Sequence, residues 1–131
     1  MKKIIVVQSI PYVLEMVREL LGTIFPQLSA LISYQSNFEE TLKIIPRDEE
    51  LTVIASDFYY DSEDVVFVNR EKDGSRLAEE IKKINPSAKV YIFSTSAPRP
   101  DYIDGFYEKG RGGDDTLKDI VNIFYDLKLA E

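Results

Sequence analysis

Short runs of apolar, β-branched residues alternate along the chain with stretches whose apolar residues recur at helical spacing. Such runs are typical of parallel strands buried on both faces. They predict strands at 4–7, 30–34, 51–57 and 89–94, and "DGFYEK" is taken as a fifth strand at 104–109. The helically spaced stretches predict four helices, at 12–24, 38–45, 73–86 and 115–127. Because strands that alternate with helices require right-handed crossovers, we expect an α/β fold with one doubly wound parallel sheet in a single domain, residues 1–131.

The first predicted helix has the clearest amphipathic pattern. One apolar stripe is expected to face the core, formed by Val13, Met16, Val17, Leu20, Leu21 and Ile24. Ser9 is placed to cap this helix, and Pro11 suits its first turn. Pro26 is expected to end the helix. In the second strand-helix unit, Ser36 or Asn37 is expected to cap the helix at 38–45.

Composition narrows the range of possible functions. The chain has no cysteine and no histidine, which removes thiolate metal sites, the usual zinc ligand and the usual general base. The net charge of −7, from 23 acidic against 16 basic residues, argues against a nucleic-acid partner. No apolar run approaches the length of about 18 residues that suggests a membrane span. We therefore expect a cytoplasmic protein that is not an enzyme and binds neither nucleic acid nor membrane.

Polar residues follow several predicted strands at the edge where open α/β sheets bind their ligands. Gln8 and Ser9 follow the first strand, and Asp57 ends the third. Ser94 ends the fourth strand and Lys109 ends the fifth. An amide, two hydroxyls, a carboxylate and an ammonium group are thus expected to converge on one rim.

Four segments in this order carry a resemblance to a known family: "IIVVQSIP", "LTVIASD", "DGSRLAEEIKKINPSAKVYIFST" and "DGFYEKG". Together they resemble the receiver domain of bacterial two-component response regulators over nearly the whole chain. The third segment is the most specific of the four. The resemblance implies a five-stranded parallel sheet in the order 2-1-3-4-5, and a phosphoryl group accepted by an aspartate at the end of the third strand.

The resemblance also implies roles for individual residues. Asp57 matches the phosphoacceptor, Ser94 the hydroxyl residue that moves toward the phosphoryl group, and Lys109 the lysine that holds it. Phe106 matches the aromatic switch position on the fifth strand. A core role for Phe106 is an equal alternative, because aromatic residues at this spacing often face inward.

The metal site departs from the family pattern. The family holds magnesium with an acidic pair after the first strand and with the acceptor aspartate, whereas the pair is Gln8 and Ser9 in this chain. The formal charge of the rim falls from about −3 to −1. Losing two anionic ligands should cost a hard cation several kcal/mol. We therefore expect Mg²⁺ binding at Asp57 to be weak or absent, with Asp57 paired instead to Lys109.

Two connections also differ in length. The segment 58–72 is long for a strand-to-helix loop, and "DVVFVNR" within it alternates like an extra strand. Its acids Asp61, Glu63 and Asp64 either replace the lost metal ligands or belong to a solvated surface excursion, which is the favoured reading. Between Ser94 and Gly105, two prolines forbid a regular helix, so the family's fourth helix is expected to be shortened or lost.

Three functions fit these features. The first is an atypical single-domain receiver that signals by binding other proteins, with phosphoryl acceptance on Asp57 weakened or lost. Its expected partners are a histidine kinase or an output protein, and a homodimer is compatible with it. The alternative is a conventional phospho-accepting receiver, such as the N-terminal part of a transcription regulator, that uses acids of the 58–72 insert for its metal. A small-ligand or nucleotide-binding enzyme of flavodoxin-like shape ranks last, because the loop after the first strand lacks glycine.

Overall fold

The computed structural model describes the backbone of residues 2–56, 58–60, 68–94, 101–108 and 113–129, and side chains within 2–56, 74–93, 101–108 and 117–129. The helices are α1 (Pro11–Ile24), α2 (Phe38–Lys43), α3 (Gly74–Ile84) and α4 (Gly113–Asp126), with a short 3-10 turn at Pro26–Leu28. The strands are β1 (Lys3–Val7), β2 (Ile32–Gln35), β3 (Leu51–Ser56), β4 (Phe58–Tyr60), β5 (Val68–Asp73), β6 (Lys89–Ser94) and β7 (Gly105–Glu108).

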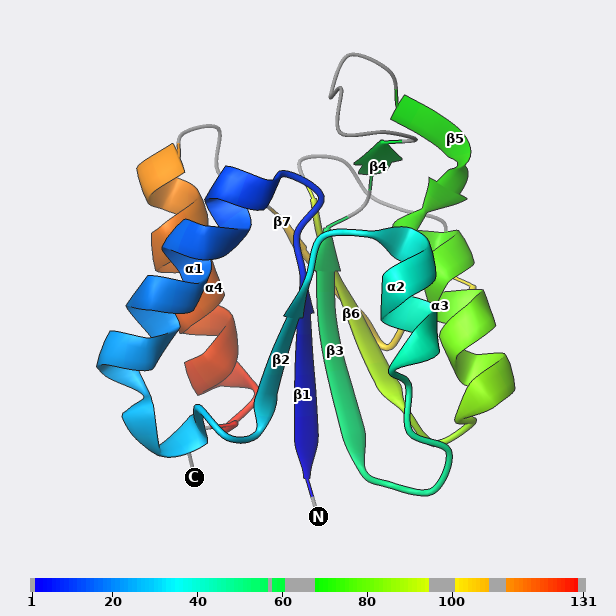
Figure 1. Cartoon of the computed structure of the whole chain (residues 1–131), viewed down its shortest axis with the longest axis horizontal. Coiled ribbons are helices and arrows are strands. Elements are labelled where there is room, and N and C mark those ends of the chain that lie inside the picture. The colour runs from blue at the N-terminus through cyan, green and yellow to red at the C-terminus, as the bar shows by residue number, and fades with distance from the viewer. Residues whose placement is uncertain (1, 57, 61–67, 95–100, 109–112, 130–131) are drawn as a thin grey trace.

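Five of the strands form one parallel sheet in the order β2-β1-β3-β6-β7. In chain order this is the predicted 2-1-3-4-5 arrangement, with β6 and β7 as the fourth and fifth strands. The helices α1 and α4 cover one face of the sheet, and α2 and α3 cover the other (Figure 1). The predicted doubly wound fold is therefore confirmed.

Alternate residues of the central strands supply the two halves of the core. Ile4 and Val6 of β1 pack toward α1 and α4, whereas Ile5 and Val7 pack toward α2 and α3. All six residues of β3 are buried, as expected for a central strand covered on both faces. This pleat fixes the direction of the last residues of each strand, and hence of the rim beyond them.

The start of α1 differs from the sequence prediction. Its N-cap residue is Ile10, and no side chain caps the helix, so the prediction that Ser9 is the cap was wrong. Pro11 does occupy the first turn, and the helix ends at Ile24, just before Pro26 begins the 3-10 turn. In α2, by contrast, the Asn37 side chain accepts a hydrogen bond from the Glu40 backbone N–H at 3.0 Å, which confirms the predicted cap.

The buried stripe of α1 also differs. The residues that reach the core are Leu14, Val17 and Leu21. Met16 and Ile24, which were predicted to be in the stripe, are 40% and 38% exposed. Val17 and Leu21 were therefore predicted correctly, whereas Leu14 was missed, because the apolar arc of this helix is wider than the surface that the sheet can cover.

The long connection between β3 and α3 contains a second, two-stranded antiparallel sheet. Phe58 of β4 pairs with Asp73 of β5, and Tyr60 pairs with Val68. The extra strand predicted within 64–70 is thus present, but it begins at Val68 and extends to Asp73. Figure 1 shows this pair of strands standing beyond the carboxyl ends of the main sheet. The acids Asp61, Glu63 and Asp64 lie outside the described residues.

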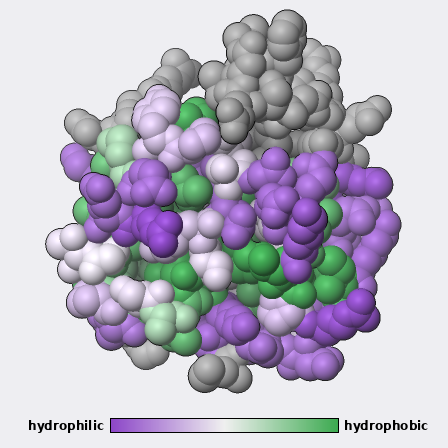
Figure 2. Space-filling view, in the orientation of Figure 1, coloured by the Kyte–Doolittle hydropathy of each residue, from purple (hydrophilic) through white to green (hydrophobic). Residues whose placement is uncertain are grey.

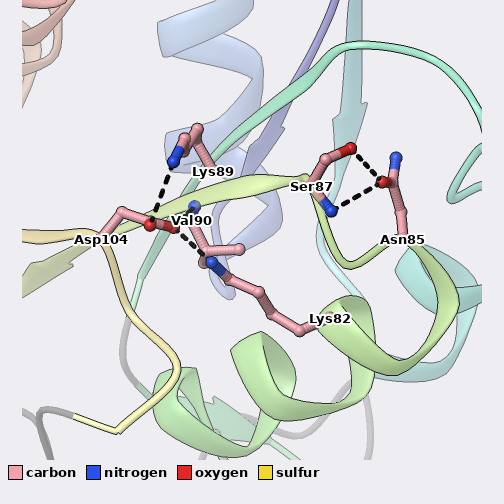
Figure 3. A network of polar contacts seen from close by, with 6 residues as sticks. All are labelled: Lys82, Asn85, Ser87, Lys89, Val90 and Asp104. Carbon is pink, nitrogen blue, oxygen red and sulfur yellow. Dashed lines mark hydrogen bonds and ion pairs between the residues drawn. The ribbon is translucent and has the colours of Figure 1, made fainter.

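The connection from β6 to β7 contains no helix in its described part, residues 101–104, in line with the predicted shortening. Asp104 joins this connection to the sheet (Figure 3). Its carboxylate accepts hydrogen bonds from Val90 N at 2.7 Å and from Lys82 Nζ at 2.8 Å, and its own N–H donates to Val90 O at 2.7 Å. A side chain therefore begins the β6–β7 ladder. Among the described helices, none is long and apolar enough to span a membrane.

Candidate functional site

The carboxyl ends of β1, β3, β6 and β7 lie next to one another because these strands are neighbours in the sheet. The backbone of Ser94 is in register with Glu108, which directly precedes Lys109. Ser56 ends β3 and directly precedes Asp57. The topology thus brings together the strand ends that carry the predicted site. Asp57, Lys109 and the side chain of Ser94 lie outside the described residues, so their predicted roles, and the predicted pairing of Asp57 with Lys109, stay predictions.

Gln8 is buried in the turn after β1 rather than held out at the rim. Only 5% of its surface is exposed. Its backbone N–H donates to Gln35 O at 3.0 Å, extending the β1–β2 pairing by one residue. Its side-chain Oε1 accepts a long hydrogen bond, 3.4 Å, from Ile10 N. The amide oxygen at this position therefore faces the backbone of its own turn, at the point where α1 begins.

Ser9 contributes through its backbone. Its N–H donates to Ser56 Oγ at 3.1 Å, linking the turn after β1 to the last residue of β3. Ser56 is buried and was not among the predicted site residues; its position directly before Asp57 in "LTVIASD" is the signal in the sequence. Gln8 and Ser56 also line a small cavity of about 10 Å³ together with Phe93. That volume is about the space that one water molecule needs.

The described part of this rim offers no carboxylate at the two positions after β1. Among the residues that the structure describes, no three or more Asp, Glu, His or Cys residues gather as they would around a metal ion. An amide and a hydroxyl are weaker ligands for a hard divalent cation than carboxylates are. A carboxylate buried as deeply as Gln8 would also pay a desolvation cost that the neutral amide avoids. The donor set after β1 therefore does not fit Mg²⁺ in the way that an acidic pair would.

Adjacent residues of β7 lie in different environments. Phe106, in register with Ile92, is 37% exposed, so it is not a core residue. Its predicted role as a switch stays a prediction. Tyr107 packs near Tyr91, and its hydroxyl donates a short hydrogen bond to Asp126 Oδ2 of α4. Partial burial, this hydrogen bond and the negative charge of Asp126 raise the pKa of Tyr107 well above its usual range.

Several solved structures share this fold over its full length. The response regulator protein TrrA from Thermotoga maritima, solved in complex with Mg²⁺-BeF, aligns over 100% of both chains with a TM-score of 0.62 and 23% identity. A CheY-like receiver domain protein from Methanospirillum hungatei aligns over 100% of this chain and 99% of its own, with a TM-score of 0.62 and 15% identity. The chain has the fold of a response-regulator receiver domain.

The receiver fold also appears as part of a longer neighbour. The response regulator RcsB from Salmonella typhimurium aligns over 100% of this chain but 61% of its own, with a TM-score of 0.61 and 16% identity. At the level of sequence, no protein-family model matches this chain and no curated protein matches it. The chain thus shares the receiver fold with these proteins at 15–23% sequence identity.

Proposed function

We propose that this chain is an atypical single-domain receiver that acts in cytoplasmic signal transduction by binding other proteins. In this proposal Mg²⁺-dependent phosphoryl acceptance on Asp57 is weakened or lost, and the protein is not an enzyme. The observation that carries it is the buried, neutral Gln8, 5% exposed, at a position where the receiver pattern needs an acid. The expected partners are a histidine kinase or an output protein.

The physical reason lies in the charge that phosphoryl transfer brings to a carboxylate. Negative charge approaches negative charge, so a metal ion and a cationic side chain have to neutralise the site. Lys109 supplies one positive charge in the sequence, but the metal would have a single sequence-assigned carboxylate, Asp57. Gln8 Oε1 meanwhile accepts a hydrogen bond from Ile10 N, and the Ser9 N–H is bonded to Ser56. The groups after β1 therefore support the turn rather than a cation.

The test is phosphorylation by a small donor. The intact chain is incubated with acetyl phosphate and Mg²⁺, and its mass is followed by mass spectrometry. We expect the wild-type chain to stay unmodified. A variant with the acidic pair restored, Gln8→Asp with Ser9→Asp, should gain one phosphoryl group, and adding Asp57→Asn to that variant should abolish the gain. Stoichiometric modification of the wild type on Asp57 would contradict the proposal.

The alternative, a conventional receiver whose metal is held by acids of the 58–72 insert, has one supporting observation. Phe58 pairs with Asp73, so the first and last residues of the 58–72 insert lie close together, near the carboxyl end of β3. Calorimetric titration with Mg²⁺ separates the two functions. Micromolar binding that is lost in the triple variant Asp61→Asn, Glu63→Gln, Asp64→Asn would favour the alternative. Undetectable binding in both chains would favour the atypical receiver.

A further inference from the structure

The helix α1 carries a second apolar stripe that does not face the core. Its members repeat every four residues, so they lie along one side of the helix: Tyr12, Met16, Leu20 and Ile24. Tyr12 is 69% exposed, and Met16 and Ile24 are 40% and 38% exposed. Figure 2 shows hydrophobic residues among hydrophilic ones on the α1 side of its face. The apolar residues of α1 therefore cover a wider arc of the helix than the part that packs on the sheet.

The neighbouring helix α4 completes this surface. The two helices lie side by side on the same face of the sheet (Figure 1). Between them runs an open groove of about 560 Å³, lined by Leu20, Ile24, Leu117, Lys118, Val121 and Asn122. Tyr125, one turn beyond Val121, is 59% exposed. Two ridges with an apolar groove between them form a surface of the kind that packs against other helices.

Two exposed residues of opposite charge lie at or next to residues that line the groove, Lys118 in the lining itself and Glu19 next to Leu20. Glu19 precedes Leu20 on α1, and Lys118 follows Leu117 on α4; both are exposed. Among the described residues, neither side chain forms an ion pair or a hydrogen bond. By contrast, Lys82 and Lys89 are each paired with Asp104. The charges beside the groove are thus available to a partner.

These two charges lie at the same height along the helices. The rings of Phe25, directly after α1, and Phe124, two residues before the end of α4, stack with centroids 5.5 Å apart, so these two residues lie at about the same height along the helices. Glu19 is six residues before Phe25 (25 − 19 = 6), and Lys118 is six residues before Phe124 (124 − 118 = 6). Because both helices run in the same direction from the rim, the rise per residue keeps the two charges level.

We propose that a second copy of this chain occupies the groove, forming a symmetric dimer through α1 and α4. A twofold axis parallel to the two helices places α1 of each copy over α4 of the other without changing height. Glu19 then faces Lys118 of the partner subunit, and the reverse pair forms on the other side of the axis. A self-complementary surface is what an isologous interface requires. This dimer goes beyond the proposed function and does not depend on whether Asp57 accepts phosphate.

The size of the surface indicates a weak association. Each helix has 14 residues and so extends about 21 Å, and two helices side by side are about 20 Å wide. The footprint is roughly 400 Å² per copy, below the 800 Å² per partner of a standard interface. We therefore expect a dissociation constant in the micromolar range or weaker, and an equilibrium that responds to the concentration of the chain.

Charge exchange tests both the dimer and its geometry. Sedimentation velocity of the full chain over roughly 5 to 500 μM, a range set by the expected weak affinity, measures the dissociation constant. Glu19→Lys alone and Lys118→Glu alone each make both cross-pairs repulsive, so each should raise this constant about tenfold or more. An equimolar mixture of the two variants makes both cross-pairs attractive, and should dimerise within about threefold of the wild type.

Controls keep the outcome decisive. Lys43→Glu, on α2 across the sheet, changes the charge as Lys118→Glu does and should leave the dissociation constant unchanged. Both variant sites are exposed, and circular dichroism of each variant is the check that it folds like the wild type. A wild-type chain that stays monomeric throughout the concentration range would contradict the proposed dimer. The groove between α1 and α4 would then be a site for a helix of another protein. Variants that dimerise like the wild type, or a mixture that does not recover, would also contradict the dimer.

Discussion

The backbone N–H of Ser9 donates a hydrogen bond to Ser56 Oγ across 3.1 Å, joining two segments that are 47 residues apart in the chain. The bond links the turn between β1 and α1 to the last residue of β3. Ser56 is followed directly in the chain by Asp57, the predicted phosphoacceptor. A hydrogen bond between neutral groups therefore connects two described segments of the rim.

Ser56→Ala should weaken this connection. The substitution leaves the Ser9 N–H without its acceptor at a partly buried site, so we expect the free energy of unfolding to fall by about 1 kcal/mol. Urea denaturation followed by circular dichroism measures the change. Ser33→Ala, at an exposed position of β2, is the matched control and should stay within about 0.5 kcal/mol of the wild type. Equal effects of the two substitutions would argue against a specific role for the Ser56 hydroxyl.

Gly105→Ala should destabilise the chain through a single contact. A Cβ atom at residue 105 would lie 2.9 Å from Tyr91 Cδ1 and 3.1 Å from Tyr91 Cε1, the ring of its cross-strand neighbour. Because this ring also packs against Tyr107, moving it should cost about 1–3 kcal/mol. A double-mutant cycle with Tyr91→Ala tests the cause, since Gly105→Ala should cost much less once the ring is gone.

Gly22→Ala is the opposite case. Nothing lies within 4 Å of the position where the new Cβ atom would be, in the exposed part of α1. Alanine favours helix over glycine, so this variant should be more stable by about 0.5–1 kcal/mol. Thermal unfolding measures it. A loss of stability would mean that residue 22 meets a neighbour that the isolated chain does not contain.

Asn85 should be among the most sensitive polar positions. It is fully buried, and its Nδ2 donates to Pro46 O at 2.9 Å and to Glu49 O at 3.0 Å. Its Oδ1 accepts from the N–H and the hydroxyl of Ser87. Asn85→Ala removes four hydrogen bonds made by a buried side chain and takes the donor away from the partly buried carbonyls of Pro46 and Glu49, so we expect a loss of about 2–4 kcal/mol in chemical denaturation.

The control for Asn85 is Gln27→Ala, at an exposed position of the 3-10 turn. It removes a side chain of the same chemical class and should change the free energy of unfolding by less than about 0.5 kcal/mol. If Asn85→Ala were equally mild, the link from α3 to the connection between α2 and β3 would be unimportant for stability.

Alkaline pH should destabilise the chain partly through Tyr107. Burial and its hydrogen bond to Asp126 raise the pKa of Tyr107, so the folded state keeps a proton that the unfolded state loses above a pH of about 10. The unfolded state then binds fewer protons, and the free energy of unfolding falls as pH rises. The contribution is fully present below pH 10. Tyr107→Phe should show a shallower fall between about pH 9.5 and 11, measured by urea denaturation at each pH.

Two other tyrosines contribute to the same alkaline fall. Burial also raises the pKa of Tyr34 and of Tyr91, and their effect remains in the Tyr107→Phe variant. The comparison therefore uses the difference in slope between variant and wild type. Tyr12→Phe, at a residue that is 69% exposed, is the control and should follow the wild-type slope. A Tyr107→Phe slope equal to that of Tyr12→Phe would contradict the assigned role of the Asp126 hydrogen bond.

Much of the fold could be predicted from local patterns. Local patterns predicted all five strands of the main sheet, and β6 matched its predicted bounds. Asn37 was predicted as a cap from residue type and spacing alone, and the structure confirms it. These features depend on contacts within one element or with an adjacent turn, so they can be read in a short window of sequence. The extra strand was also predicted from its alternation, and the structure shows it over Val68–Asp73.

The sequence by itself determined the order of strands and helices, the absence of histidine and cysteine, and the neutral pair at positions 8 and 9. Only the tertiary structure decided where those side chains go. Gln8 turns inward and Ser9 bonds through its backbone because Ser56, 47 positions away from Ser9, lies beside them in the sheet. The outer stripe of α1 likewise became a surface only when α4 packed beside it. The burial of a side chain and the identity of its hydrogen-bond partner depend on segments that are far apart in the chain, so no local sequence pattern encodes them.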